Sequence, residues 1–598
     1  MESSTTVPVH ERATGSSTIA DLIALAAARH AERPAIRHKR DGEWRDITYA
    51  ELGETVSELG RGLIDLGIQP GDRVAIQCTT RPEWTFADFA ITTAGAVAVP
   101  IYPTNSPEEC RWVAGNSGSR AIVCEDAAQV AKIRAVRDDL PALETIIVID
   151  PSGDDGDLIT LDALRERGRG LDPAELTARS QAVTREQPYT IIYTSGTTGP
   201  PKGCVLSHGN YRDVISMCEQ DAVVQAGDVA YLFLPLAHSF ALLIQLGILD
   251  LGATLAYFGG DPKQIIVEVS EIKPTYLPSV PRIFEKLYTL VTAHGDAEQI
   301  KAATQVGLKV RALQAAGREV PAELQAHFDA AEESLFSNVR AAFGGNLRQA
   351  TSGAAPIATE ILEFFFACGV PVLEGFGMTE TATAATVSTV ESYRFGSVGR
   401  ALPGLEMKIA DDGEVLLKGP NIFQGYYNND DASFGAIVDG WLHTGDLGSV
   451  DADGFLFITG RKKDIIITAG GKNLTPANLE NDLRQSRWIS QVVMHGDRRP
   501  YPVALITLDP EEIVHFAREH ELSEDLAALS TEPKVIELIQ GELDRVNSRY
   551  AQVEKIKKFR ILDHDLSQET GELTPTLKVK RNVVNEKYAD LFDELYAG

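Results

Sequence analysis

The sequence predicts an α/β protein of several subdomains with a small separate domain at its C-terminal end, and three observations support this. Apolar runs at 73–78, 94–103, 121–126 and 145–150 alternate with helix-like segments, which is typical of parallel α/β layers. Past Gly396 the pattern changes to short strands with Asp-Gly turns, which predicts an antiparallel, barrel-like subdomain. The 598 residues also exceed what a single hydrophobic core usually holds.

The elements of the first half are read in chain order. Apolar residues at helical spacing predict helices at 18–32 and 49–67. The acidic, Gly-rich segment 151–187 is expected to be a surface connection. Residues 241–258 are the most apolar stretch, but polar residues and glycines interrupt them. A buried helix followed by a strand is therefore expected there, because a membrane span needs about 20 apolar residues with few charges.

The second half begins with an Ala-rich, polar segment at 291–345, which predicts a helical insertion outside the main core. Short strands and sharp Gly turns return at 346–384. The segment RKKDIII at 461–467 is interpreted as a junction. Strands and helices mix over the remaining stretch, roughly 130 residues, a length that suits one small domain.

The composition excludes several function classes. A hydrophobic fraction of 44% and a charged fraction of 24% are those of an ordinary soluble globular protein. The net charge of -29 repels nucleic acid and anionic lipid, so we expect no nucleic-acid partner and at most peripheral membrane contact. The six cysteines fall in no CxxC spacing, which predicts reduced, buried thiols and no zinc site. Residues 1–17 are polar, so a cytoplasmic protein is expected, with any membrane contact at the inner face.

Residues 193–208, YTSGTTGPPKGCVLSH, follow the apolar run QPYTII, which we interpret as a buried strand. Glycines let backbone N–H groups converge on an anion, hydroxyls add donors and Lys202 adds a positive charge, so the loop is a candidate phosphate site. An ordinary polar turn is the alternative. The loop is not a Walker motif, because Gly199 is followed by Pro200-Pro201-Lys202.

Four further stretches carry chemistry. TSGAAP at 351–356 predicts a tight turn that could lie along a purine, and EGFGMTE at 374–380 places an aromatic between glycines. WLHTGDLG at 441–448 puts Asp446 at a predicted strand end, where a carboxylate can accept hydrogen bonds from both ribose hydroxyls. GRKKDIIITAGGKNLTPANLE at 460–480 adds a basic cluster and two adjacent glycines.

With these motifs in this order, the sequence resembles the adenylate-forming (acyl-activating, AMP-binding) enzyme superfamily over nearly its whole length. Within it, the sequence is most similar to bacterial long-chain fatty-acid–CoA ligases, through the polar helical insertion before Ser352, NxFxGYYNN at 421–429 and GELTPTLKVKRN at 571–582. The resemblance implies a large domain, 1–460, of two α/β lobes plus a β-barrel-like lobe. It also implies a small mobile α+β domain, 461–598, with its hinge near Lys463.

The resemblance also implies a nucleotide site. The loop and Lys202 would hold the β- and γ-phosphates of ATP, Phe376 would stack on adenine, and Thr379 would touch the α-phosphate. Glu380 would ligate Mg²⁺, since one carboxylate with phosphates and waters suffices for that ion. The implied phosphate residues are Thr194, Ser195, Gly196, Thr197, Thr198, Gly199 and Lys202; the adenine-side residues are Gly353, Ala354, Glu374, Gly375, Phe376, Gly377 and Met378; the ribose residues are Asp446 and Arg461.

The C-terminal domain would contribute a catalytic lysine. Lys578 matches that position, although Thr576-Leu577 precede it where the broader family has Ser/Thr-Gly, and Lys580 stays a weaker candidate. The resemblance implies that the domain rotates about Lys463 between the two half-reactions. That rotation would withdraw Lys578 and present the loop that contains Gly470, Gly471 and Lys472.

The sequence indicates the acyl site less clearly than the nucleotide site. LPLAHSFA at 234–241 aligns with the segment where the family borders the acyl group, so His238 and Phe240 are candidate wall or gate residues. A histidine and an aromatic that merely fill the core are the alternative. An aliphatic tunnel should be lined by apolar side chains with few polar groups.

The expected activity is ATP-dependent conversion of a long-chain fatty acid to acyl-AMP with release of pyrophosphate, followed by transfer to coenzyme A with release of AMP. Mg²⁺ would be the cofactor, and the substrates the small-molecule partners; a homodimer is left open. One alternative is an acyl-AMP ligase that passes the acyl group to a carrier-protein thiol. A non-catalytic nucleotide sensor is the other, although it would have no need of Lys202, Glu380, Asp446, Arg461 and Lys578 together.

Overall fold

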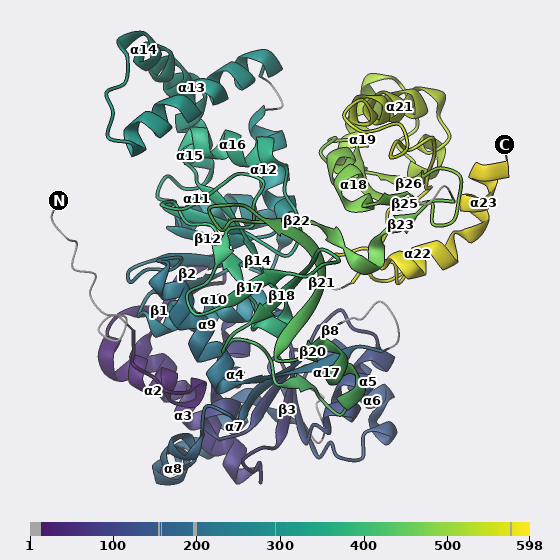
Figure 1. Cartoon of the computed structure of the whole chain (residues 1–598). Helices are drawn as coiled ribbons and strands as arrows, with labels where there is room; N and C mark the ends of the chain where they lie inside the picture. Colours follow the sequence, from purple (N-terminus) through teal and green to yellow (C-terminus); the bar gives the residue numbers. More distant parts are fainter. Residues whose placement is uncertain are drawn as a thin grey trace.

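The alternating segments of the N-terminal part form an eight-stranded sheet with the order β19-β9-β8-β4-β3-β5-β6-β7 (Figure 1). The computed structural model describes residues 13–153, 156, 158–194, 200–292, 295–469, 472–574 and 577–597. Strands β3 to β8 pair in parallel, whereas β9 and β19 continue the sheet antiparallel. β3, β4 and β5 are buried along nearly their whole length, which is typical of a sheet covered on both faces. The strands are β3 (Arg73–Gln77), β4 (Val97–Ile101), β5 (Ala121–Cys124), β6 (Thr145–Val148), β7 (Ile159–Thr160), β8 (Pro188–Thr194), β9 (Lys202–Ser207) and β19 (Gly425–Tyr426).

A second, nine-stranded sheet has the order β16-β15-β14-β13-β12-β10-β11-β1-β2, with parallel pairing from β14 to β1 and antiparallel strands at both edges. One hydrophobic cluster is shared by this sheet and the first, so the two α/β lobes pack together. The strands are β1 (Pro34–Arg40), β2 (Glu43–Thr48), β10 (Val229–Leu232), β11 (Thr254–Tyr257), β12 (Tyr276–Ser279), β13 (Gln349–Ser352), β14 (Val372–Phe376), β15 (Thr386–Val387) and β16 (Arg400–Ala401).

Helices cover these two sheets, and several begin where the sequence provides a capping residue. Ser207 at the end of β9 accepts the N–H of Asn210 at 3.0 Å, so α9 starts directly after the strand that carries Lys202. The helices are α2 (Ile19–His30), α3 (Tyr49–Asp65), α4 (Pro82–Thr93), α5 (Pro107–Ser117), α6 (Ala127–Ala135), α7 (Leu161–Arg169), α8 (Ala174–Ala182), α9 (His208–Gln220), α10 (Ser239–Asp250), α11 (Ile265–Ile272), α12 (Pro281–Thr292) and α16 (Thr359–Cys368).

The segment 151–187, predicted as a surface connection, is mostly exposed in its described residues, but it also contains β7, α7 and α8. Leu161 and Leu164 are buried where α7 packs on α3. The two helices approach so closely that a Cβ on Gly168 would lie 1.7 Å from the carbonyl oxygen of Glu58. Arg165 and Arg169 in α7 both bind the Glu58 carboxylate. The high content of charged residues masked this amphipathic pattern.

The helical insertion at 291–345 is present as α13 (Ala297–Ala315), α14 (Ala322–Ala331), a π-helical turn (Glu332–Phe336) and α15 (Ser337–Ala342). It does not lie wholly outside the core, because Phe336 and Val339 join the buried cluster that contains Phe364 and Phe365 of α16. Its outer part is drawn at the upper left of Figure 1.

The predicted buried helix and strand at 241–258 correspond to α10 and β11. In the part of the chain that the structure describes, we found no helix with both the length and the apolarity to cross a bilayer.

The antiparallel lobe past Gly396 is a five-stranded sheet in which β17, β18, β21 and β20 pair in that order and β22 pairs with β21. Its elements are β17 (Glu406–Ile409), β18 (Glu414–Lys418), α17 (Asp430–Ala436), β20 (Ile437–Val438), β21 (Trp441–Val450) and β22 (Leu456–Arg461).

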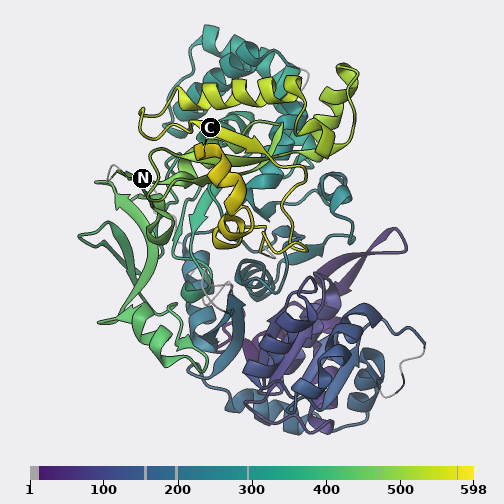
Figure 2. The ribbon, with the colours of Figure 1, turned by 90° about the vertical axis from the view of Figure 1, so that its right-hand side faces the viewer.

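The small domain follows a single 3₁₀ turn, Lys462–Asp464, at the predicted hinge. It contains a two-stranded and a three-stranded sheet. Figure 2 shows it, yellow-green to yellow, lying across the teal lobe of the large domain. Its elements are β23 (Ile466–Ile467), β24 (Asn473–Leu474), α18 (Pro476–Arg484), β25 (Ile489–His495), β26 (Val503–Leu508), α19 (Pro510–Glu519), α20 (Leu526–Leu529), α21 (Pro533–Asn547), β27 (Lys558–Ile561), α22 (Arg581–Lys587) and α23 (Ala589–Ala597).

Candidate active site

A cavity of about 1110 Å³ is lined by residues of both domains. Lys202 and Glu380 of the large domain face it, together with Arg461 at the end of β22. Lys578 of the small domain also lines it, although nearly four hundred residues separate Lys578 from Lys202. The fold therefore gathers the charged groups that the sequence scatters along the chain.

The acidic and basic groups at one side of the cavity are linked through Tyr426. Its hydroxyl donates to Oε1 of Glu380 at 2.7 Å, and Lys202 Nζ lies 5.1 Å from the centre of its ring. The geometry is set by a strand pair, since Tyr426 in β19 lies opposite Cys204 in β9, two residues after Lys202. Sequence reasoning missed Tyr426, even though it used the NxFxGYYNN stretch that contains this tyrosine.

Thr194, at the end of β8, lines the cavity opposite Lys202, with which it is paired across the β8–β9 ladder. The predicted phosphate residues Ser195, Gly196, Thr197, Thr198 and Gly199 lie outside the described residues, as do Gly470 and Gly471. The two strands that frame the loop are in place.

Two neighbouring strand ends, β13 and β14, supply the wall predicted to face adenine. Gly353 and Ala354 follow β13, and Ala354 has a left-handed φ of 69°. Gly377 must be glycine, because a Cβ there would lie 1.8 Å from the carbonyl oxygen of Thr383. The lining residues from these ends are Gly353, Ala354, Gly375, Phe376, Gly377, Met378 and Thr379.

Glu374 departs from that set, because it is not among the residues that line the cavity. Its side chain is buried, and burial raises the pKa of the carboxyl to about 8 against an opposing hydrogen bond from the N–H of Ile357. We therefore assign it to the support of β14.

Asp446 and Arg461 form an ion pair, with Nε of Arg461 2.6 Å from Oδ1 of Asp446. The prediction that Asp446 ends a strand was wrong: it lies within the long strand β21, directly opposite Arg461 in β22. Asp446 is 5% exposed and lies behind Arg461, which itself lines the cavity. A ribose that binds this carboxylate would have to share it with the guanidinium.

Lys578 is exposed to the interior of the cavity. Its pKa is lowered by the surrounding protein and by Arg461, and Asp446 and Glu380 oppose that shift. The charge of Lys578 also helps to lower the pKa of His238. Lys578 is therefore within electrostatic reach of both the predicted metal side and the predicted acyl side. The alternative Lys580 lines the same cavity.

His238 and Phe240 both line the cavity rather than only filling the core. His238 caps α10, and its Nδ1 accepts the N–H of Phe240 at 3.2 Å. Burial lowers the pKa of His238 to about 3, and the charge of Lys578 adds to the effect. The ring is therefore neutral and carries its proton on Nε2.

Beyond these residues the cavity continues between α9 and α10, where its walls are almost entirely apolar. Such a lining suits a hydrocarbon chain, because the lining residues offer few hydrogen-bonding groups to a polar ligand. Burial of each methylene there would contribute about 0.8 kcal/mol. This apolar arm is lined by Ile215, Cys218, Val223, Val224, Leu243, Ile244 and Gly247.

The hinge candidate Lys463 lies in the 3₁₀ turn between the domains and also lines the cavity. Lys472, by contrast, is not among the lining residues, and its N–H donates to the hydroxyl of Thr468 at 3.3 Å. The small domain thus turns Lys578, and not Lys472, toward the site.

Within the described residues there is no group of three or more His, Cys, Asp or Glu side chains arranged to hold a metal ion. Glu380, buried and held by Tyr426, is one of several carboxylates that line the cavity, and no three of these in the described residues are grouped to hold a metal ion. Such a donor set fits Mg²⁺ bound mainly through substrate phosphates and water.

The fold and this site define an adenylate-forming enzyme, and comparison with known families agrees: the chain belongs to the AMP-binding enzyme family. Residues 23–427 match the AMP-binding enzyme family and residues 463–598 match the AMP-binding enzyme C-terminal domain. The family resemblance predicted from the motifs is confirmed. So is the predicted fold class.

Two relatives and one solved structure illustrate the similarity. The chain is 41% identical over 567 residues to the long-chain-fatty-acid–CoA ligase FadD15 of Mycobacterium bovis, and the match covers 93% of each chain. It is 32% identical to the long-chain-fatty-acid–CoA ligase ACSBG2 of Xenopus laevis, over 97% of this chain and 84% of that one. The structure of a Mycobacterium tuberculosis fatty acyl CoA synthetase superposes with a TM-score of 0.62 at 23% identity, covering 96% of this chain and 99% of that one.

Proposed function

We propose that this protein is a long-chain fatty-acid–CoA ligase that uses ATP. The carboxylate of the fatty acid attacks the α-phosphorus of ATP, pyrophosphate leaves, and acyl-AMP forms. The thiol of coenzyme A then attacks the acyl carbonyl, and AMP leaves. The observation that carries the proposal is the position of Lys578 in a cavity that joins a charged side, with Glu380 and Arg461, to an apolar arm. The relatives named as long-chain ligases support the choice of substrate.

In the first half-reaction the residues position two anions and neutralise the charge between them. The Lys578 ammonium would face the carboxylate and the α-phosphate, and Lys202 would face the outer phosphates. The neutral His238 can donate from Nε2 without adding charge. Mg²⁺, held by Glu380 and the phosphates, would supply further neutralisation of the leaving pyrophosphate.

In the second half-reaction the nucleophile changes from a carboxylate to a thiol. A free thiol has a pKa near 8.5, so a useful thiolate fraction exists near neutral pH without a dedicated base. The thiol needs a path to the acyl carbonyl. Lys578 and its neighbours Val579 and Lys580 line one side of the cavity. We propose that the small domain rotates about Lys463 to open that path and to bring Lys472 toward the site.

The proposal is tested with purified protein, ATP and Mg²⁺, and a ladder of carboxylic acids from acetate to stearate, with and without coenzyme A. Pyrophosphate, AMP and thioester are measured separately. The expected result is all three products, with a preference for the long acids. Pyrophosphate without thioester would favour the carrier-protein alternative, and the absence of every product would favour a nucleotide sensor.

The role of Lys578 is tested through the two half-reactions. Lys578→Ala should block adenylation, leaving only a small residual rate of pyrophosphate release, yet spare thioester formation from supplied acyl-AMP. Lys580→Ala is the matched comparison, and a larger loss in that variant would transfer the catalytic role to Lys580. Equal loss of both half-reactions in Lys578→Ala would count against the assignment. The domain limits, the hinge, a homodimer and peripheral membrane contact stay predictions.

A further inference from the structure

Lys578 lies in one of two short paired segments of the small domain, 572–574 and 577–580, which together are called the hairpin below. Leu573 pairs with Val579 across its base. The N–H of Lys580 donates to the carbonyl of Glu572 at 2.7 Å, and the N–H of Thr574 donates to the carbonyl of Lys578 at 2.8 Å. The position of the Lys578 backbone therefore depends on how firmly Glu572 is held at the base of the hairpin.

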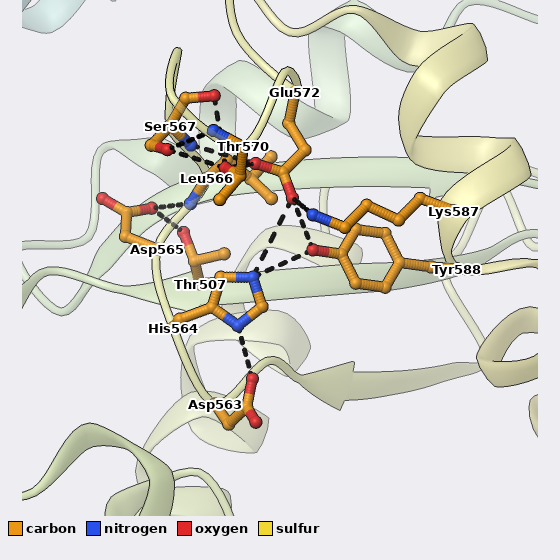
Figure 3. A network of polar contacts seen from close by, with 10 residues as sticks. All are labelled: Thr507, Asp563, His564, Asp565, Leu566, Ser567, Thr570, Glu572, Lys587 and Tyr588. Carbon is orange, nitrogen blue, oxygen red and sulfur yellow. Dashed lines mark hydrogen bonds and ion pairs between the residues drawn. The ribbon is translucent and has the colours of Figure 1, made fainter.

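The carboxylate of Glu572 is fully buried at the centre of a polar network (Figure 3). One oxygen accepts from Lys587 Nζ at 2.6 Å and from the Tyr588 hydroxyl at 2.7 Å. The other accepts from the N–H of Ser567 at 3.2 Å and from the hydroxyl of Thr570. Burial alone would raise the pKa of Glu572, but these bonds lower it to about 2, so the group stays ionised.

The network ties the hairpin to a helix. Lys587 ends α22 and Tyr588 follows it, while Arg581 at the start of α22 binds the Glu480 carboxylate at 2.7 Å. The hairpin base is thus fixed to a helix whose own start is fixed to α18, which contains Glu480.

Lys578 needs such support because its position is electrostatically unfavourable: the surrounding protein and the charge of Arg461 both work against its own charge. A lysine on a loose hairpin would leave the cavity for water, since its long side chain loses rotamer freedom when it is held. The network around Glu572 holds the hairpin rigidly, and this keeps Lys578 in a position that its own interactions do not favour.

We propose that Glu572 is a positioning residue that holds Lys578 in the cavity for formation of acyl-AMP. The role rests on the proposed function and applies to the first half-reaction, because Lys578 is not needed for attack by the thiol. The ionised carboxylate is the required feature: an amide at this site would accept fewer of the four bonds and would lose the pairing with Lys587.

The test measures both half-reactions in Glu572→Gln. Pyrophosphate release from ATP and fatty acid should fall by about 10- to 100-fold, as for other displacements of a catalytic group, while thioester formation from supplied acyl-AMP stays within about two-fold. The control is Tyr550→Phe, which removes a hydroxyl that donates to Asp482 at 2.8 Å elsewhere in the same domain, outside the network of Figure 3. This control should leave the ratio of the two rates unchanged.

A double-mutant cycle separates positioning from a general structural effect. In the Lys578→Ala background, Glu572→Gln should cause no further loss of the residual adenylation, because its effect acts through Lys578. An additional loss in that background, or an equal loss of both half-reactions in the single variant, would overturn the proposal. If Glu572→Gln fails to fold in thermal melts, Tyr588→Phe and Lys587→Met, which each remove one donor, take its place under the same criteria.

The proposed function and this inference fail in different ways. Absence of all products in the wild-type protein would reject the former. A Lys578→Ala variant that behaves as expected, beside a Glu572→Gln variant with an unchanged ratio of half-reactions, would reject the latter alone.

Discussion

The hydroxyl of Tyr426 donates to Glu380 at 2.7 Å, while the ammonium of Lys202 lies over its ring, 5.1 Å from the ring centre. One side chain therefore orients both the carboxylate proposed to bind Mg²⁺ and the lysine proposed to face the outer phosphates. Mutation of a residue that orients a metal ligand typically lowers metal affinity or activity by about 10- to 100-fold.

Tyr426→Phe should raise the Mg²⁺ concentration needed for half-maximal pyrophosphate release by about 10-fold. The ring stays beside Lys202, so only the hydrogen bond to Glu380 is lost. The measurement is a titration of initial rate against Mg²⁺ at saturating ATP and fatty acid. Tyr427→Phe, at the next position, is the control, and an equal effect in both variants would contradict a specific link to Glu380.

Gly247 in α10 should set how long an acyl chain the apolar arm accepts. It lines the arm, and a Cβ at this position would meet Val224 Cγ2 at 3.6 Å, an ordinary contact distance. Gly247→Ala should fold at least as well, because alanine favours a helix over glycine by about 0.8–1.0 kcal/mol. Gly247→Phe should instead block the arm and move the optimum of the carboxylic-acid ladder to shorter chains. An unchanged optimum would place the chain end elsewhere.

Two ion pairs between the domains should favour the first half-reaction. Arg282 in α12 binds Asp509 at 2.5 Å, and Lys286 binds Glu511 at 2.8 Å at the start of α19. Rotation of the small domain would break both. Because exposed pairs contribute about 0–1 kcal/mol each, the double variant Arg282→Ala/Lys286→Ala should slow adenylation by about two- to five-fold at low salt and much less at high salt.

The comparison for that prediction is Arg518→Ala, which breaks a pair with Glu524 inside the small domain. It should leave adenylation unaffected at either ionic strength. A salt-independent loss in the double variant would mean that the two pairs do not control the orientation of the domain.

Asp88 should make the stability of the large domain depend on pH. It is fully buried, where it accepts from the Tyr189 hydroxyl at 2.8 Å and from Gln245 at 2.9 Å. Burial raises its pKa from 3.8 to about 7, and these two bonds oppose the shift. The folded state therefore binds the proton of Asp88 more tightly than the unfolded state does. The protonated carboxyl contributes its full stabilisation below about pH 4, and this stabilisation is lost as the pH rises through about 7.

Asp88→Asn mimics the protonated form and should remove that dependence. Relative to the wild type, the variant should gain thermal stability at pH 8 by an amount on the order of a few kcal/mol, and little at pH 4. Melting temperatures at several pH values check this. A difference that does not change with pH would mean that Asp88 is not the titrating group.

The sequence by itself determined the local elements and the identity of the chemical groups. The apolar runs at 73–78 and 121–126 are strands because continuous β-branched and aliphatic residues suit a sheet buried on both faces. The motifs identified the family and placed Lys202, Glu380 and Lys578 at one site, since each motif matches a family position residue by residue. Short-range patterns carry this information, and so the chain alone suffices for it.

Only the tertiary structure decided how those groups are held. Tyr426 reaches Glu380 through a strand pair between segments more than two hundred residues apart, and Glu572 supports Lys578 through donors on α22. The amphipathic helix α7, whose buried face packs on α3, also depends on a partner distant in the chain. Such contacts follow from side-chain packing and from the need to pair every buried charge. A local sequence pattern does not show which distant residue pairs with a given buried charge.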